Sequence, residues 1–237
     1  MTRVLIAVVA LAAGIESAQA ATYHRFWRGT KLATLSAGEF IQGLNQVFIP
    51  ATVQTGAGKR MIAYEPILTA GIENLPDEVA LVSYENKATY DSLYATDAGK
   101  AYQNLHWQYF DRSSSHSLTP CPYIGKVEIE QAYDLHPEYA DWRKNQTTVA
   151  VFLRRSDESD PAYLVRVAEH LNADLIRDPK DGVLDRTILV AQSYWLEYVS
   201  GESAITAEPT ANYLLSVKSE VPSAAQIIVG GGVNLQF

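Results

Sequence analysis

The chain has 237 residues, of which 47% are hydrophobic and 19% are charged, and its formal net charge at pH 7 is −8. This composition is that of a globular protein with a sizeable core, and it excludes disordered and fibrous proteins. An acidic chain with no block of Lys or Arg lacks the clustered positive charge of a nucleic-acid binder. The lone cysteine, Cys121, excludes an internal disulfide and a cysteine-rich zinc site.

Residues 1–20 have the pattern of a secretory signal peptide. Arg3 supplies a positive charge, residues 4–13 form an apolar run, and Ala18-Gln19-Ala20 matches a cleavage site. The apolar run is shorter than the roughly 20 residues that cross a bilayer, and no later segment is long and apolar enough to do so. An N-terminal core helix is the alternative interpretation. We therefore expect a protein without a membrane span that is periplasmic or secreted.

The first part of the mature chain, residues 21–135, is expected to form one α+β unit. Ser36, with Glu39 three positions later, forms a capping box that begins a helix. In chain order the expected elements are a strand at 23–28, the helix that begins at Ser36, strands at 61–68 and 78–84, a tyrosine-rich helical stretch at 87–109, and a strand at 123–133. The order βαββαβ is that of a ferredoxin-like unit.

Residues 148–237 are expected to repeat that order after a linker at 136–147. The expected elements are a strand at 149–153, a helix from Asp160-Pro161, a strand at 188–191 that leads into a Tyr-containing helix at 194–198, a helix at 209–218, and a strand at 226–229. Residues 79–84 and 187–192 occupy matching places in the two halves, which favours an internal duplication.

The segment at residues 78–90 carries a resemblance to a known family. It reads EVALVSYENKATY, a strand followed by a small helix that bears an aromatic residue. This pattern resembles the stress-responsive and antibiotic-monooxygenase-like branches of the dimeric α+β barrel superfamily, and the resemblance extends over residues 22–135 and 148–230. It implies two ferredoxin-like sheets that pair face to face, in a homodimer or within one duplicated chain. It also implies a cofactor-free monooxygenase or cyclase as one candidate activity.

The densest group of chemically active side chains lies at residues 102–112. At helical spacing Tyr102, His106 and Tyr109 share one face. Histidine titrates near neutral pH and is therefore the natural proton carrier. The alternative is that His106 and Trp107 only pack in a core or at a dimer contact.

Alternation along the strand at 23–28 places Arg25 and Trp27 on one face. If that face points into a barrel, Arg25 can bind an anionic group and Trp27 can stack on a ring. Tyr64 and Tyr84 lie in the middle of two other strands and are expected to face the same cavity. The alternative is an amphipathic edge strand whose long side chains reach solvent.

These residues fit three functions. The first is an exported lyase that cleaves an acidic, uronate-containing polysaccharide such as alginate by β-elimination. In it, His106 is the expected base, Tyr109 or Tyr84 the acid, and Arg25 the carboxylate clamp, with Trp27, Tyr64, Trp107 and Tyr102 in contact with the substrate. The second is a cofactor-free monooxygenase or cyclase that acts on a small aromatic molecule. The third is a non-catalytic periplasmic ligand-binding or stress protein.

No cofactor and no metal are expected. The chain carries no P-loop, no dinucleotide-binding glycine motif and no nucleophile-elbow or zinc-protease motif. Its five histidines show no metal-ligand spacing among themselves.

Overall fold

The computed structural model describes residues 22–54, 61–136, 146–177, 182–201 and 211–217. The expected signal peptide at 1–20, most of the expected linker and the expected strand at 226–229 lie outside these residues. Among the helices described, none has both the length and the apolar character needed to cross a bilayer.

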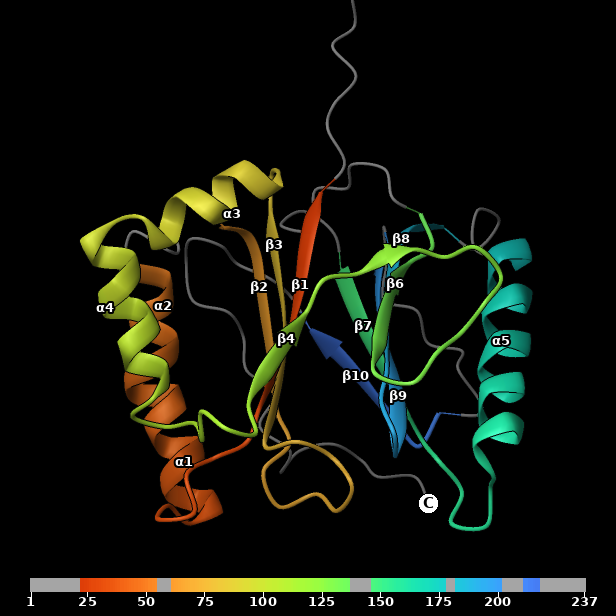
Figure 1. Ribbon diagram of the computed structural model, residues 1–237, viewed down its shortest axis with the longest axis horizontal. Helices are drawn as coiled ribbons and strands as arrows, with labels where there is room; N and C mark the ends of the chain where they lie inside the picture. Colours follow the sequence, from red (N-terminus) through yellow and green to blue (C-terminus); the bar gives the residue numbers. More distant parts are fainter. Residues whose placement is uncertain (1–21, 55–60, 137–145, 178–181, 202–210, 218–237) are drawn as a thin grey trace, which may run out of the picture.

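Four antiparallel strands form the first sheet, in the order β2-β3-β1-β4. They are β1 (Tyr23–Gly29), β2 (Met61–Leu68), β3 (Glu78–Tyr84) and β4 (His116–Leu118). A layer of helices covers its outer face (Figure 1): α1 (Ala37–Gly43), the π-helical turn η1 (Leu44–Phe48), α2 (Ile49–Gln54), α3 (Lys87–Tyr94) and α4 (Asp97–His106). The predicted capping box is present at the start of α1, where Ser36 and Glu39 bond each other's backbone N–H.

The second sheet has the order β10-β7-β9-β8-β6-β5. Its strands are β5 (Cys121–Pro122), β6 (Gln131–Asp134), β7 (Gln146–Leu153), β8 (Val183–Val190), β9 (Tyr194–Gly201) and β10 (Tyr213–Val217). Helix α5 (Asp160–Arg177) lies against its outer face (Figure 1). Strands β7, β8, β9 and β10 repeat the order of β1, β2, β3 and β4, with the first and third strands of each unit side by side. The predicted pair of ferredoxin-like units is therefore confirmed.

The two sheets face each other, and the helices lie outside them (Figure 1). The core between the sheets is shared, since Phe26 and Leu81 of the first sheet pack with Val149 and Leu196 of the second. Polar contacts also cross it: the hydroxyl of Tyr198 donates to the backbone oxygen of Glu65 at 3.0 Å. The face-to-face pairing implied by the resemblance thus occurs within one chain.

A buried histidine lies in this interior. His24 Nδ1 is 2.7 Å from the hydroxyl of Ser83, and Nε2 is 3.4 Å from a carboxylate oxygen of Asp185 on the opposite sheet. All three residues are at most 3% exposed. The cluster is buried and connects the two sheets, so we assign it a structural role.

The strand expected at 123–133 is wrong in position. Only residues 131–134 of this region form a strand, β6, and it pairs with β8 in the second sheet. The first sheet ends instead with the three-residue β4. Gly125 and Glu130 have positive φ values of 86° and 62°, so the chain turns at both ends of the alternating stretch between them.

Two expected helices are strands. Residues 194–201 form β9, whose eight residues are all buried because β7 and β8 flank it and both of its faces are covered. Residues 213–217 form β10, which pairs with β7. The expected single helical stretch at 87–109 is divided into α3 and α4 by Thr96, whose hydroxyl caps α4 by accepting from Gly99 N at 3.0 Å.

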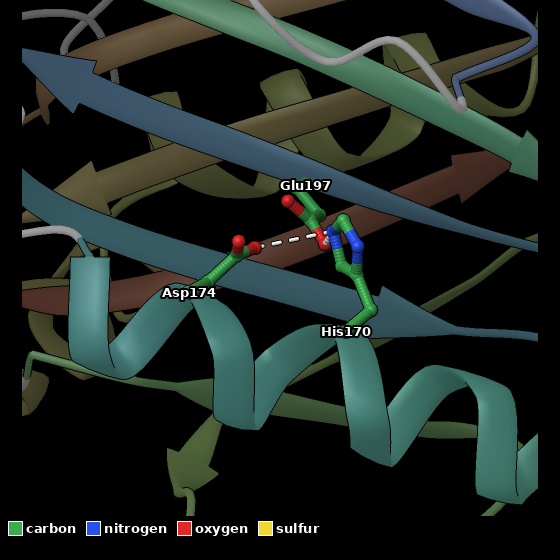
Figure 2. Close-up of side chains that lie close together, drawn as sticks. All are labelled: His170, Asp174 and Glu197. Carbon is green, nitrogen blue, oxygen red and sulfur yellow. Dashed lines mark ion pairs between the residues drawn. The ribbon is translucent and has the colours of Figure 1, made fainter.

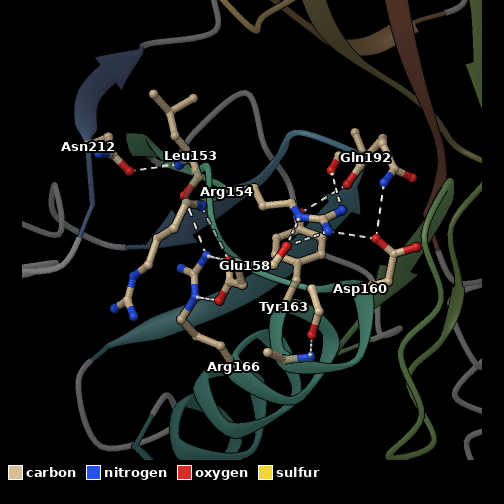
Figure 3. A network of polar contacts seen from close by, with 12 residues as sticks. Leu153, Arg154, Glu158, Asp160, Tyr163, Arg166, Gln192 and Asn212 are labelled. Atoms are coloured by element: carbon tan, nitrogen blue, oxygen red, sulfur yellow. Dashed lines mark hydrogen bonds and ion pairs between the residues drawn. The ribbon is translucent and has the colours of Figure 1, made fainter.

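The start of α5 is held to the second sheet by arginines (Figure 3). Arg154, directly after β7, lies 2.6 Å from an oxygen of Asp160, the first residue of α5. Arg166 binds Glu158 through Nε and Nη2 at 2.7 and 2.6 Å, and its guanidinium lies 4.5 Å from the ring centre of Trp195. These contacts fix the helix over the sheet.

Candidate active site

A pocket of about 300 Å³ lies between the outer face of the first sheet and its helices. Its wall is mainly aromatic: Trp27, Phe48, Tyr64, Tyr84, Tyr90, Tyr94, Tyr102 and Trp107. Its polar lining consists of Arg25, Gln103, His106, Ser115, His116 and Ser117. This volume is at the lower end for small-molecule sites, and apolar walls with a few polar groups are typical of such sites.

The structure brings most of the predicted site residues together. The pocket lining includes all but one of them: Arg25, Trp27, Tyr64, Tyr84, Tyr102, His106 and Trp107. The exception is Tyr109. Helix α4 ends at His106, so helical spacing no longer applies three residues later. The ring of Tyr109 instead packs against Phe48, at 6.0 Å between ring centres, and against the backbone of Gly43.

The predicted alternation along β1 is confirmed, but the predicted orientation of its two faces is wrong. Phe26, not Trp27, belongs to the core between the sheets. Trp27 packs in the cluster between the first sheet and its helices, and Arg25 lines the pocket on that same side. The cavity therefore lies outside the barrel interior. The interior itself is filled by mostly apolar side chains from both sheets.

His106 is held in one protonation state. Its Nδ1 lies 3.0 Å from the backbone oxygen of Tyr102, and because a carbonyl only accepts, Nδ1 is the donor. The rings of Tyr102, Phe48 and Trp27 surround it at 4.6, 4.8 and 5.1 Å between centres. Burial lowers the pKa of His106 to about 4, so at neutral pH the ring is uncharged and Nε2 carries a lone pair.

Three tyrosines of the pocket, Tyr64, Tyr84 and Tyr102, are phenols at neutral pH. Burial raises the pKa of Tyr64, Tyr84 and Tyr102 well above the usual value. Each is therefore a hydrogen-bond donor or a very weak acid. Among the predicted proton acceptors of the pocket, His106 alone has a chemically available lone pair.

Arg25 supplies the positive charge of the pocket. Its guanidinium lies 4.8 Å from the ring centre of Tyr90 and donates to the hydroxyls of Ser117 and Tyr23. Its Nε–H is buried and has no hydrogen-bond partner within the described part of the chain. A buried donor without a partner costs free energy, which a ligand oxygen would recover.

Glu78, which the sequence interpretation missed, lies beneath the pocket. This carboxyl is fully buried, and the hydroxyl of Tyr64 donates to it at 3.4 Å. Burial raises the pKa of Glu78 to about 8, against the opposing effect of hydrogen bonds from Trp27 and Tyr64. The sequence feature that could have indicated this buried carboxyl is a glutamate at the start of a mainly apolar strand.

The Glu78→Gln variant is expected to lose less stability than the wild type as the pH rises. Glu78 binds its proton more tightly in the folded state, so its stabilising contribution is complete below the unfolded pKa near 4.5 and disappears as the pH rises through about 8. One such proton changes the free energy of unfolding by about 1.4 kcal/mol per pH unit. The decrease of this free energy with pH should therefore be less steep in the variant, by up to that amount. Urea unfolding at pH 5 and pH 8 measures it. The exposed Glu73→Gln should keep the wild-type slope, and an equal slope in Glu78→Gln would contradict the expectation.

No protein-family model and no curated protein matches this chain. Among solved structures, a "Putative monooxygenase" from Fusobacterium nucleatum is 10% identical, with 87% of this chain and 95% of that chain covered and a TM-score of 0.42. An anthrone oxidase-like protein is 11% identical, with 77% and 73% covered and a TM-score of 0.35. A chlorite dismutase mutant from Candidatus Nitrospira defluvii is 8% identical, with 77% of each chain covered and a TM-score of 0.32. The assignment of the fold rests on the strand order of the chain itself.

Proposed function

We propose that the protein oxidises a small aromatic ketone or phenol that carries an acidic C–H group, using O₂ as the oxidant and no bound cofactor. The substrate ring lies between the aromatic side chains of the pocket. His106 is the base, and Arg25 stabilises the oxygen that becomes negative when the proton leaves.

The observation that carries this proposal is the state of His106. A neutral imidazole with Nδ1–H bonded to Tyr102 presents only Nε2 to other partners, inside a pocket lined by rings. A low-dielectric wall strengthens the attraction between Arg25 and a developing enolate. The hydroxyls of Tyr84 and Tyr102, which remain protonated, are donors to the same oxygen.

The reaction balances without a further reductant. His106 removes one proton from a CH₂ group next to the ring system, and the resulting anion transfers electrons to O₂ and forms a hydroperoxide. Loss of water from the hydroperoxide leaves a carbonyl. One CH₂ group and one O₂ thus give one C=O and one H₂O, and His106 returns its proton to the departing oxygen.

The size and shape of the pocket favour this substrate over an acidic polysaccharide. Cleavage of a polymer within its chain requires a groove that several sugar residues can cross, whereas a cavity of about 300 Å³ holds one small molecule. Tyr109, one of the two expected acids for β-elimination, is not among the residues that line the cavity. We therefore place the lyase second.

The test uses anthrone, a fused-ring ketone with an acidic CH₂ group, as the probe. We expect quenching of tryptophan fluorescence, since Trp27 and Trp107 line the pocket, and consumption of one O₂ per ketone oxidised above the rate without protein. Parallel incubation with alginate and hyaluronan should give no ultraviolet absorbance from unsaturated uronates. Such absorbance would establish the lyase instead. Quenching without O₂ uptake would indicate a binding protein.

A further inference from the structure

A second group of reactive side chains lies on the far side of the molecule from the pocket, between α5 and the second sheet (Figures 1 and 2). His170 and Asp174 are four residues apart on α5 and share one face of the helix, and Glu197 projects from β9 toward them. His170 Nε2 lies 3.1 Å from Asp174 Oδ2 and 2.8 Å from Glu197 Oε1. From this arrangement we propose that His170, Asp174 and Glu197 bind one divalent transition-metal ion of the zinc type.

The distances suit a metal site. The imidazole nitrogen and one oxygen from each carboxylate all lie within 4.8 Å of one another. Two ligand atoms that each lie about 2.0–2.2 Å from an ion are about 3.4 Å apart at the tetrahedral angle of zinc. The separations of 2.8 and 3.1 Å around His170 Nε2 are shorter than that value, so the side chains must move apart by a few tenths of an ångström for one ion to contact all three.

One proton cannot bridge His170 Nε2 to both carboxylates, whereas one metal ion can contact all three side chains. The single N–H of an imidazole points in one direction, whereas His170 Nε2 faces an oxygen of each carboxylate. His170 Nε2 and Glu197 Oε1 are both buried, and neither makes a hydrogen bond of good geometry with any of the residues described, despite their close approach. A cation placed between the three side chains would contact all of these atoms together.

The charges of the cluster are compatible with a cation. Asp174 and Glu197 are 1% and 0% exposed, and together they carry two negative charges. Arg186 from β8 donates to Asp174 at 2.8 Å and also pairs with Glu197, which neutralises one charge. Although burial opposes it, Asp174 and Glu197 raise the pKa of His170 to about 10, so without an ion the protonated imidazole balances the second charge, and a bound ion would take the place of that proton. Arg186 in addition fixes the orientation of both carboxylates, as supporting residues around metal ligands commonly do.

The donor set indicates the class of metal. One nitrogen and two carboxylate oxygens suit zinc, manganese or ferrous iron better than magnesium or calcium, which prefer oxygen alone. His170 is 17% exposed, so the cluster is reachable from solvent and water can complete the coordination. Three protein ligands with an open position are the pattern of zinc sites that bind water or a substrate. The sequence interpretation compared histidines only with one another, and so missed Asp174 on the same helix and Glu197 on β9.

The test is titration of the whole, chelator-treated protein with ZnCl₂ by calorimetry. We expect one ion per chain, a rise in Tm with Zn²⁺, and visible absorption when Co²⁺ is used in its place. His170→Ala should weaken Zn²⁺ binding by 100-fold or more and abolish the rise in Tm. Because His170 is partly exposed, this variant should fold, and circular dichroism checks it.

Two matched variants exclude other sites. Glu169→Gln removes an exposed carboxylate next to His170, and Cys121→Ser removes the exposed thiol. Both should bind Zn²⁺ as the wild type does. The proposal is overturned if Zn²⁺ does not saturate a site, if His170→Ala binds as tightly as the wild type, or if Cys121→Ser abolishes binding. None of these results depends on the oxidation proposed for the pocket.

Discussion

His106→Asn is expected to lower kcat for the oxidation of anthrone by about 10²- to 10⁴-fold and to leave KM close to its wild-type value. Asparagine places an N–H donor where Nδ1 of His106 lies, so the hydrogen bond to the Tyr102 carbonyl can be kept. It has no atom at the position of Nε2 and cannot accept the substrate proton there. Steady-state O₂ uptake over a range of anthrone concentrations separates the two parameters.

The pH dependence gives a second readout of the same base. Because burial lowers the pKa of His106 to about 4, the ring is already neutral and able to accept a proton at pH 5. We expect kcat/KM to fall only below about pH 4 and to show no change near pH 6.5, where an exposed histidine titrates. A rising limb near pH 6.5 would show that His106 is not the base.

Tyr109→Phe is the matched control for the His106 variant. It removes a hydroxyl from the same short segment but from outside the pocket lining, and it keeps the ring that packs against Phe48. Its kcat should remain within about twofold of wild type. If Tyr109→Phe and His106→Asn lose activity equally, the loss reflects the packing of the end of α4, and His106 is not the base.

The composition of the site was predictable because strand alternation and helical spacing decide which side chains share a face. Arg25 with Trp27, and Tyr102 with His106, follow directly from periods of 2 and 3.6. Which face of β1 meets the second sheet was not predictable from either period. That choice depends on Phe26 fitting among small and branched side chains that are distant in the sequence, such as Val149. The position of Tyr109 was missed because the end of a helix depends on local capping.

The repeated strand order was predictable from the buried apolar runs, whereas the final element of each unit was not. Residues 213–217 become a strand because β7 offers an unpaired edge beside them, and a segment's own residues do not reveal such a tertiary partner. The same reason applies to β6, which joins the second sheet through β8 although it directly precedes the expected linker. Arg186 and Glu197 were missed because charged residues in buried strands are unfavourable unless a partner lies opposite, and the partner Asp174 is on α5.

Arg186→Met is expected to reduce the free energy of unfolding by about 3–5 kcal/mol. The Arg186 side chain is 1% exposed and lies between Asp174 and Glu197, which are equally buried. Methionine fills similar space but removes the guanidinium that pairs with both carboxylates. Urea unfolding in buffer with a chelator measures the loss without any contribution from bound metal.

Two comparisons show whether the loss comes from an uncompensated buried charge. Lys87→Met breaks an exposed ion pair with Asp91 and should leave the free energy of unfolding close to that of the wild type, since solvent screens that pair. Arg186→Met combined with Glu197→Gln should be less destabilised than the sum of the two single variants, because the second change removes one of the charges that the first leaves unpaired. Additive losses would mean that Arg186 acts through packing alone.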